Sequence, residues 1–311
     1  MIFVTLKKCV DGVLSSRLIN CKNIGCKSFK TKPLKPNEKT RKYYEKKWND
    51  YFQNKRTLGC EFVLDKGDWI SNSSGVFGFG KGFTSKGSIK CSGGNKKFII
   101  NLKKNTIGNS RSDILYSSQI ISVLSGAICE IKNGVLKAKN VYDKGSVLYV
   151  GMYGVLDCKS CYFEGSHTNR SGGVIYGCEH SDIKLTNCKF NNNSANGFGG
   201  AVFVESNSNF QCVNCEFINN SSKFARGGAI YFKDSSKNLC LQSCTFKNNK
   251  SRYCNETVFV GDNNNLLCSN CNFKHGDYYD LVYAHKYANV ELVDCDNNIL
   301  LKEHMYGYLK S

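Results

Sequence analysis

A motif of Cys, any residue and Phe recurs through the second half of the chain, and it limits the fold more than any other feature. Successive copies are 27, 27, 29, 27 and 24 residues apart, and the last copy keeps only Cys295. The complete copies are Cys161 and Phe163, Cys188 and Phe190, Cys215 and Phe217, Cys244 and Phe246, and Cys271 and Phe273. Self-similarity at such a period is typical of solenoids and arrays, in which one unit of chain stacks on copies of itself.

Two further signatures run in phase with this motif. Pairs of glycine occupy one place in the repeat, at Gly172 and Gly173, Gly199 and Gly200, and Gly227 and Gly228. An asparagine follows three residues after Phe, at Asn193, Asn220 and Asn249. The glycine pairs predict a corner that needs positive φ or a close approach of neighbouring coils.

Apolar residues alternate with polar ones just before each Cys, as at Ile183 and Leu185. A period of two indicates a half-buried strand rather than a helix. Each repeat therefore predicts about three short strands separated by turns of Asn, Ser and Gly. One such coil cannot bury its apolar side alone, whereas a stack of coils can. We expect an all-β fold, a right-handed parallel β-helix with inward columns of Cys, Phe and aliphatic residues.

A column of polar residues lies just ahead of the apolar pairs. Its members are Asp182, Asn209, Asn238, Asn265 and Asn289. Asparagine tolerates left-handed backbone and forms hydrogen bonds with neighbouring backbone groups, so this column is expected to stabilise a corner of the β-helix.

The combination of a Gly-Gly-Ala-aliphatic motif with Phe-x-x-Asn resembles the repeat of the polymorphic membrane proteins. The Phe-x-x-Asn motifs at Phe190, Phe217 and Phe246 carry the resemblance, which extends over roughly residues 155–275. It implies a pectin lyase-like β-helix that acts as an adhesin at the cell surface. A host or cell-surface macromolecule or glycan is the partner that the resemblance implies.

The chain divides into two predicted regions. Residues 1–57 form a basic N-terminal region, in which residues 37–56 read as an amphipathic helix that caps the open end of the solenoid. Residues 58–311 form the β-helix, with degenerate coils over 58–154, clear repeats over 155–295 and a C-terminal cap over 296–311. Six apolar or neutral residues precede Lys7, too few for the core of a signal peptide, and no apolar run is long enough to span a membrane.

Positive charge is concentrated in the first third of the chain. Of the formal net charge of +18, residues 1–112 supply 24 Lys and Arg against 7 Asp and Glu. A basic surface with aromatic residues is typical of proteins that bind nucleic acid or anionic glycans. Candidate contacts to an anionic ligand are Lys42, Lys46, Lys47, Trp48, Lys96 and Lys97. The alternative, which the helical pattern favours, is that residues 37–56 serve only as the cap.

Eighteen cysteines leave three interpretations open. Cys158 and Cys161, Cys212 and Cys215, and Cys268 and Cys271 are Cys-x-x-Cys pairs. The first Cys of a pair stands where other repeats have Leu, which favours a ladder of buried thiols. Disulfides between stacked coils and a metal site are the other two interpretations.

No constellation in the sequence indicates a catalytic centre or a cofactor. Many β-helix enzymes that cleave polysaccharides place acidic pairs on neighbouring coils, but the residues aligned with Asp182 are asparagines. Asp277 and Asp280 are the nearest approach to such a pair. We therefore expect a non-enzymatic binding or adhesion scaffold without cofactor. The alternatives are a carbohydrate-active β-helix and a binder of nucleic acid or anionic glycan through the basic first third.

Overall fold

The structure is a computed structural model of the whole chain. It describes residues 119–295 except 125, 140, 237, 253–255 and 275–280. Before residue 119 it describes only short segments, at 4–9, 29–30, 60–64, 68–71, 77–79, 89–92, 97–102 and 106–108. The predicted helix at 37–56 and the predicted cap at 296–311 lie outside these residues. The described residues contain strands and turns and no helix.

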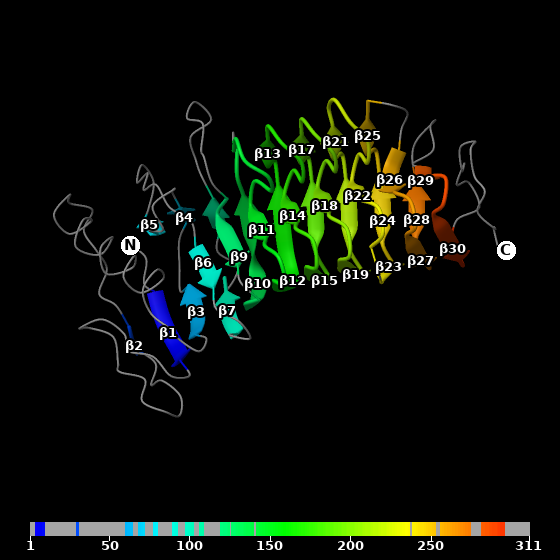
Figure 1. Cartoon of the computed structure of the whole chain (residues 1–311). Helices are drawn as coiled ribbons and strands as arrows, with labels where there is room; N and C mark the ends of the chain where they lie inside the picture. The colour runs from blue at the N-terminus through cyan, green and yellow to red at the C-terminus, as the bar shows by residue number, and fades with distance from the viewer. Residues whose placement is uncertain are drawn as a thin grey trace.

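Three sheets of stacked strands build a parallel β-solenoid (Figure 1). The long sheet holds β1 (Val4–Cys9), β2 (Phe29–Lys30), β3 (Cys60–Leu64), β4 (Asp68–Ser71), β5 (Phe77–Phe79), β7 (Lys97–Asn101), β8 (Thr106–Gly108), β10 (Ile128–Lys137), β12 (Val155–Glu164), β15 (Asp182–Thr186), β16 (Lys189–Asn191), β19 (Asn209–Val213), β20 (Glu216–Ile218), β23 (Leu239–Gln242), β24 (Thr245–Lys247), β27 (Asn265–Ser269), β28 (Asn272–Lys274) and β30 (Asn289–Val293). The eight-stranded sheet holds β6 (Ile89–Ser92), β9 (Ile121–Leu124), β11 (Leu148–Val150), β14 (Ile175–Gly177), β18 (Val202–Val204), β22 (Ile230–Phe232), β26 (Glu256–Val260) and β29 (Leu281–Ala284). The four-stranded sheet holds β13 (His167–Thr168), β17 (Ser194–Ala195), β21 (Ser221–Ser222) and β25 (Lys250–Ser251).

A regular coil contains four strands rather than the three that the sequence suggested. In the coil that begins at Asp182, β15 and β16 lie in the long sheet, β17 in the four-stranded sheet and β18 in the eight-stranded sheet. Each strand pairs in parallel with its counterpart one repeat later, so Phe190 pairs with Phe217 and Val202 with Ile230. The parallel β-helix expected from the sequence is therefore present, and its right-handed sense stays a prediction.

Strands of the N-terminal region also join the long sheet. β1 pairs in an antiparallel manner with β2 and β3, and β3 pairs in parallel with β7. These strands show that the stretch assigned to a cap, residues 1–57, contributes strands to the long sheet. The boundaries of the two predicted regions stay predictions.

Left-handed backbone marks the corners of the coil. One column of corners immediately precedes the Cys of the repeat, and its residues have φ between 50° and 59°: Asn133, Ser160, Asn187, Asn214, Ser243, Asn270 and Asp294. Asparagine dominates this column because its short polar side chain tolerates left-handed backbone. Each corner turns the chain so that the residues on both sides of it can point into the core.

The glycine pairs combine the two properties expected of them. The first glycine of each pair is left-handed, with φ of 71° at Gly172, 67° at Gly199 and 70° at Gly227. The second glycine lies against the next coil, since a Cβ built on Gly200 would lie 2.0 Å from the carbonyl oxygen of Gly228. Any larger residue at the second position would push neighbouring coils apart.

The buried asparagine column is the one that follows Phe in each repeat. The Asn220 amide donates to the side-chain oxygen of Asn249 at 2.9 Å and to the carbonyl of Phe190 at 3.0 Å. Its own side-chain oxygen accepts from the backbone N–H and the amide of Asn193. Asn193, Asn220 and Asn249 are all 0% exposed. This ladder satisfies buried backbone groups of adjacent coils at the corner.

The column at Asp182 and Asn209 contributes less to the corner of the coil than its place in the sequence suggested. Its members are exposed or half-buried and are in register, and the amide of Asn238 donates to Asn209 at 2.9 Å. Because water can satisfy these side chains, the column adds little to the corner. The expectation that this column helps to stabilise a corner rests on this contact alone, since the buried contacts at the corner belong to the column at Asn193.

The core consists of stacked columns in register. The rings of Phe163, Phe190, Phe217, Phe246 and Phe273 stack with centroids 4.6 to 5.1 Å apart. Beside them lies the thiol column Cys161, Cys188, Cys215, Cys244, Cys271 and Cys295. Each of these thiols donates to the backbone carbonyl two residues before it, at 3.3 to 3.5 Å. The cysteines therefore fill the core as small apolar side chains with a weak local hydrogen bond.

The glycine columns give a prediction with an internal comparison. Gly200→Ala should destabilise the protein by more than about 3 kcal/mol, because its Cβ would collide with backbone of the next coil. Gly165→Ala should cost only about 1 kcal/mol, since Gly165 has a φ of 59° but its nearest Cβ neighbour is 4.0 Å away. Urea denaturation of both variants checks the order, and equal losses would contradict it.

The asparagine ladder gives a second prediction. Asn220→Ala removes partners from Asn193, Asn249 and the Phe190 carbonyl and leaves them buried, so we expect a loss of about 3 kcal/mol in the free energy of unfolding. Gln211→Ala, at an exposed position of the same coil, should change it by less than about 0.5 kcal/mol. A small effect of Asn220→Ala in urea denaturation would show that water replaces the ladder.

Candidate binding surface

The residues of the repeat signature form the core and not a contact surface. The glycines and asparagines among them lie at the corners, and the Cys and Phe columns point inward with exposures of 5% or less, apart from the half-buried Cys295. Of the predicted contacts to an anionic ligand, Lys42, Lys46, Lys47, Trp48 and Lys96 lie outside the described residues. Lys97 begins β7, where it pairs with Ile128. Any binding surface of the described solenoid must therefore come from other, outward residues.

The outward face of the eight-stranded sheet carries an aromatic column. Six of the eight strands, β11, β14, β18, β22, β26 and β29, contribute one ring each at the same register position: Tyr149, Tyr176, Phe203, Tyr231, Phe259 and Tyr283. Adjacent rings are nearly parallel, with centroids 4.6 to 6.0 Å apart. Burial raises the pKa of Tyr231 to about 12. The rings stack on one another, and Phe198 lies across Phe203 and Tyr231.

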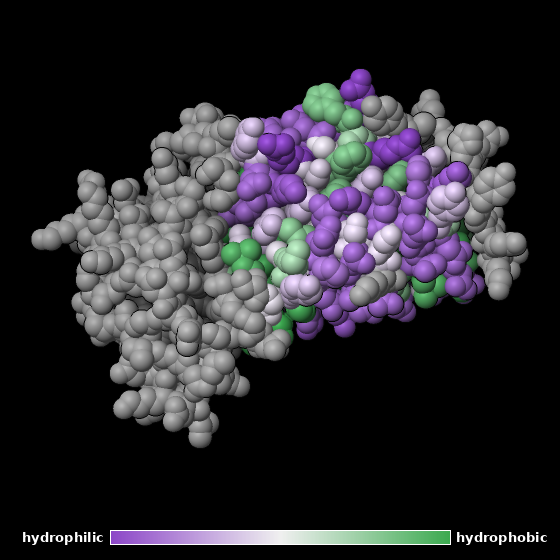
Figure 2. Space-filling model, viewed as in Figure 1, coloured by the Kyte–Doolittle hydropathy of each residue, from purple (hydrophilic) through white to green (hydrophobic). Residues whose placement is uncertain are grey.

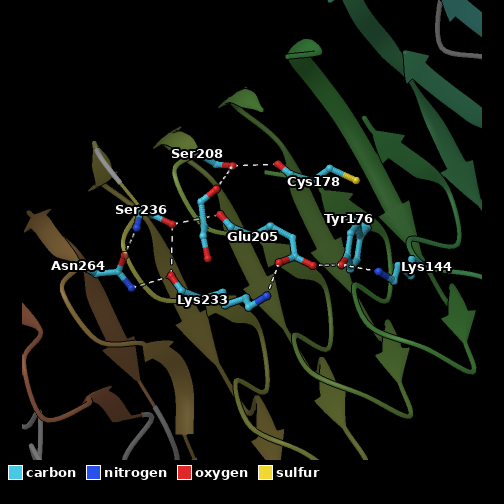
Figure 3. Close-up of polar contacts among 9 residues, drawn as sticks. Lys144, Tyr176, Cys178, Glu205, Ser208, Lys233, Ser236 and Asn264 are labelled. Carbon is cyan, nitrogen blue, oxygen red and sulfur yellow. Dashed lines mark hydrogen bonds and ion pairs between the residues drawn. The ribbon is translucent and has the colours of Figure 1, made fainter. Parts of the chain in front are cut away.

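A charged network covers part of this column (Figure 3). Tyr176 donates its hydroxyl hydrogen to Glu205, Lys233 forms a 2.7 Å ion pair with the same carboxylate, and Lys144 donates to the Tyr176 oxygen at 2.8 Å. Burial acts to raise the pKa of Glu205, but the hydrogen bonds from Lys233 and Tyr176 outweigh it and lower that pKa. Burial and the Glu205 carboxylate raise the pKa of Tyr176. Glu205 is therefore an ionised carboxylate that accepts hydrogen bonds from Tyr176 and Lys233, and it does not act as a proton donor.

Hydrogen bonds at the next corner continue this network. Ser208 donates to the carbonyl of Cys178 at 2.9 Å, and Asn264 donates to the carbonyl of Lys233 at 2.8 Å. Ser236 donates to the carbonyl of Glu205 at 3.2 Å (Figure 3). These contacts satisfy backbone carbonyls between coils, so the corner is structural.

A ridge of basic and aromatic side chains follows the corner between the four-stranded sheet and the glycine pairs. We define the basic ridge as Lys144, Arg170, Lys223, Lys250 and Arg252 together with Tyr142, Phe198 and Phe224, all of which are exposed. These residues come from successive coils, because each lies between the end of the Phe-x-x-Asn motif and the glycine pair or its equivalent. Figure 2 shows hydrophilic and hydrophobic residues side by side along the edge where β13, β17, β21 and β25 lie.

Cation–π contacts hold the ridge together. The Arg170 guanidinium lies 5.3 Å from the Tyr142 ring, and that of Arg252 lies 6.0 Å from the Phe224 ring. Behind them, Arg226 pairs with the buried carboxylate of Glu256 at 3.3 Å. Within the described part of the chain no carboxylate pairs with Arg170, Lys223 or Lys250. The ridge therefore presents net positive charge on a solenoid whose overall charge is near zero.

An open polar cleft of about 470 Å³ adjoins one end of the ridge. Its lining is Asn219, Asn220, Ser221, Asn248 and Lys250. Amides, a hydroxyl and an ammonium group are donors and acceptors of the kind that bind polar, oxygen-rich ligands. Lys250 belongs to both features, so the cleft and the ridge form one continuous surface.

One acidic pair lies on neighbouring coils, in a region where the repeat is degenerate. Glu130 of β10 is in register with Asp157 of β12. Lys132 binds Glu130 at 3.2 Å and Lys159 binds Asp157 at 2.7 Å. This pair was not predicted from the sequence, and Asp277 and Asp280, which were predicted as the nearest approach to an acidic pair, lie outside the described residues. Each acid of the observed pair has a lysine of its own strand as its partner.

Comparison with known protein families identifies one coil. Residues 187–205 match the Chlamydia polymorphic membrane protein repeat. The matched repeat runs from the left-handed corner at Asn187 through Phe190, Asn193 and the glycine pair to Glu205, just after β18. The matched residues therefore cover most of one coil, from its corner at Asn187 through β16, β17 and β18, and leave out its first strand, β15. The comparisons with curated proteins and with solved structures gave no match.

A search of the described residues for a helix long and apolar enough to cross a membrane found none. The basic ridge was not recognised in the sequence, because its members lie at exposed places that differ from one coil to the next. Aligning the repeats on their asparagines and glycine pairs would have placed these residues in one segment of the repeat, between the asparagine and the glycine pair.

The charged network predicts a specific dependence on pH. Because the folded-state pKa of Glu205 is lowered from its ordinary value of 4.5, its contribution to stability is present above that value and is lost as pH falls through the folded-state pKa. Glu205→Gln should therefore lower the urea midpoint at pH 7, and the difference from the wild type should shrink at acid pH. A difference that stays constant over this range would contradict the role assigned to the carboxylate.

Proposed function

We propose that the protein is a non-catalytic β-solenoid that acts as an adhesion or binding scaffold at a cell surface, and that it binds an acidic glycan along the basic ridge. The polymorphic membrane protein repeat supports the surface class, since the proteins named for that repeat are membrane proteins. The observation that carries the ligand class is the ridge, where cationic and aromatic side chains recur on neighbouring coils.

The spacing of the ridge suits a linear polymer. Neighbouring coils are about 4.8 Å apart, so cations on coils one or two repeats apart lie within about one Debye length and act together on the same ligand. An acidic polysaccharide carries repeated carboxylate or sulfate groups along an extended chain. Arginine and lysine can pair with these groups, while exposed rings such as Phe224 can contact the faces of sugar rings.

The distribution of charge over the whole chain favours the same ligand class. The first third of the sequence carries the net excess of Lys and Arg, which would attract a polyanion at long range whatever its contacts. The predicted contacts at Lys42, Lys46, Lys47, Trp48, Lys96 and Lys97 would then extend the ridge surface.

The carbohydrate-active alternative receives support from one observation, the register pair Glu130 and Asp157. Hydrolysis of a glycosidic bond needs one carboxylic acid that keeps its proton. Each of the two acids is instead engaged in an ion pair with a lysine of its own strand. We therefore assign the pair to the structure of the long sheet and expect no release of reducing ends from acidic polysaccharides.

A ridge variant tests the proposal with replacements taken from the chain's own repeats. Lys223→Asn introduces the residue found at the equivalent position of the preceding coil, Asn196, and Lys250→Ser introduces the residue found at the equivalent position two coils earlier, Ser194. Arg170→Gln removes a third charge. The triple variant should bind heparin at least about tenfold more weakly, because three close cations are lost. Its affinity should also depend less steeply on salt between about 50 and 200 mM.

The control removes the same charge elsewhere. Lys137, Lys184 and Lys247 are exposed on the long sheet, and changing all three to Gln should leave heparin affinity within about twofold of the wild type. An equal loss of heparin affinity in both triple variants would show that only the net charge of the protein matters, and it would contradict a defined binding site. Binding of single-stranded DNA with the same affinity and the same response to the ridge variant would overturn the glycan assignment.

A further inference from the structure

Three cysteines converge at the C-terminal end of the described solenoid. The Sγ atoms of Cys268, Cys271 and Cys295 all lie within 4.8 Å of one another, and those of Cys268 and Cys295 are 3.7 Å apart. Within the part of the chain that the structure describes, this is the single group of three metal-ligating side chains so close together.

The corner at Asn270 brings two of the thiols together. In a continuous strand, residues three apart point to opposite faces. Asn270 has a φ of 51° and interrupts the strand between β27 and β28, so that Cys268 and Cys271 both point into the core. The third thiol comes from the next coil, where Cys295 follows the equivalent corner at Asp294. The three ligands are thus fixed by backbone corners and by the pairing of β27 with β30.

We propose that Cys268, Cys271 and Cys295 form a binding site for a thiophilic d¹⁰ cation such as Zn²⁺. Thiolate ligands bind zinc at about 2.3 Å in tetrahedral geometry, which places neighbouring sulfur atoms about 3.8 Å apart. The distance of 3.7 Å between the Sγ atoms of Cys268 and Cys295 matches this value. Small rotamer changes can bring the third sulfur to the same separation.

Distance and access distinguish this cluster from cysteines deeper in the solenoid. Cys158, Cys161 and Cys188 repeat the spacing, as do Cys212, Cys215 and Cys244, but neither group brings its three sulfur atoms as close together, and all six side chains are 2% exposed or less. Cys295 is half-buried, so a cation can reach the cluster without opening a coil. Binding forms three S–M bonds and releases three thiol protons to the solvent, and a water molecule takes the fourth position. The site with Zn²⁺ carries one negative charge.

The test uses the full chain, freed of metal and kept reduced with a phosphine. Titration with Cd²⁺, followed by its thiolate-to-metal charge-transfer absorption, should show one tight site, and Zn²⁺ should compete for it. Binding should weaken steeply as pH falls, because three protons compete with the cation. Cys295→Ser and Cys271→Ser should each lower the affinity at least tenfold.

The matched control is Cys240→Ser, because Cys240 is a half-buried thiol of the long sheet outside the cluster. It should leave the titration unchanged, and circular dichroism should show that all variants keep the solenoid. Absence of a charge-transfer band in the reduced wild type would overturn the proposal. An equal response of Cys295→Ser and Cys240→Ser, or a Cys268–Cys295 disulfide that survives reduction and blocks binding, would also overturn it. Loss of heparin binding by the ridge variant is a separate result and does not bear on this site.

Discussion

Register between neighbouring coils is the constraint on which the rest of this structure depends. Parallel pairing places each residue beside its equivalent one repeat later, so every inward position has to be compatible with a copy of itself. Flat rings stack, amides form ladders and thiols pack in a column because each of these groups can contact its own kind. A charged side chain could not be repeated in this way without repulsion. The buried columns are therefore simple in composition, and the sequence repeats for that physical reason.

The same constraint directs variation to the corners. The interval between Cys215 and Cys244 is two residues longer than its neighbours, yet strands on both sides of the insertion keep their register. One extra residue lies between Phe217 and Ile230, next to Phe224 on the basic ridge, and the other lies between Tyr231 and Asn238. Corners tolerate extra residues because their side chains face water rather than another coil. A binding surface made of corner residues can therefore change without loss of the fold.

This division decides how much could be predicted from the sequence. The period, the inward Cys and Phe columns and the special role of the glycine pairs were predictable, since burial forces them to recur. Which of the two asparagine columns is buried could not be predicted, because composition alone does not separate a buried amide such as Asn220 from a partly exposed one such as Asn209. The basic ridge carries no periodic signal. Glu130 and Asp157 are one period apart, but the coil of Glu130 has Gly134 and Leu136 in place of the Cys and Phe of the motif, so the pair became visible only when the register was known. The helix at 37–56 lies outside the described residues, and the strand β1 shows that part of the same region joins the long sheet.

The thiol column links the fold to its surroundings. At the cell surface that we propose for this protein, conditions are oxidising, and the thiolate is the form of cysteine that reacts. Burial raises the pKa of the Cys158 and Cys212 thiols and excludes oxidants, so these side chains are protected by their place in the core. Cys295 is the last described member of the column and is only half-buried, so burial protects it less. A cation held by Cys268, Cys271 and Cys295 would keep all three sulfur atoms out of disulfide exchange.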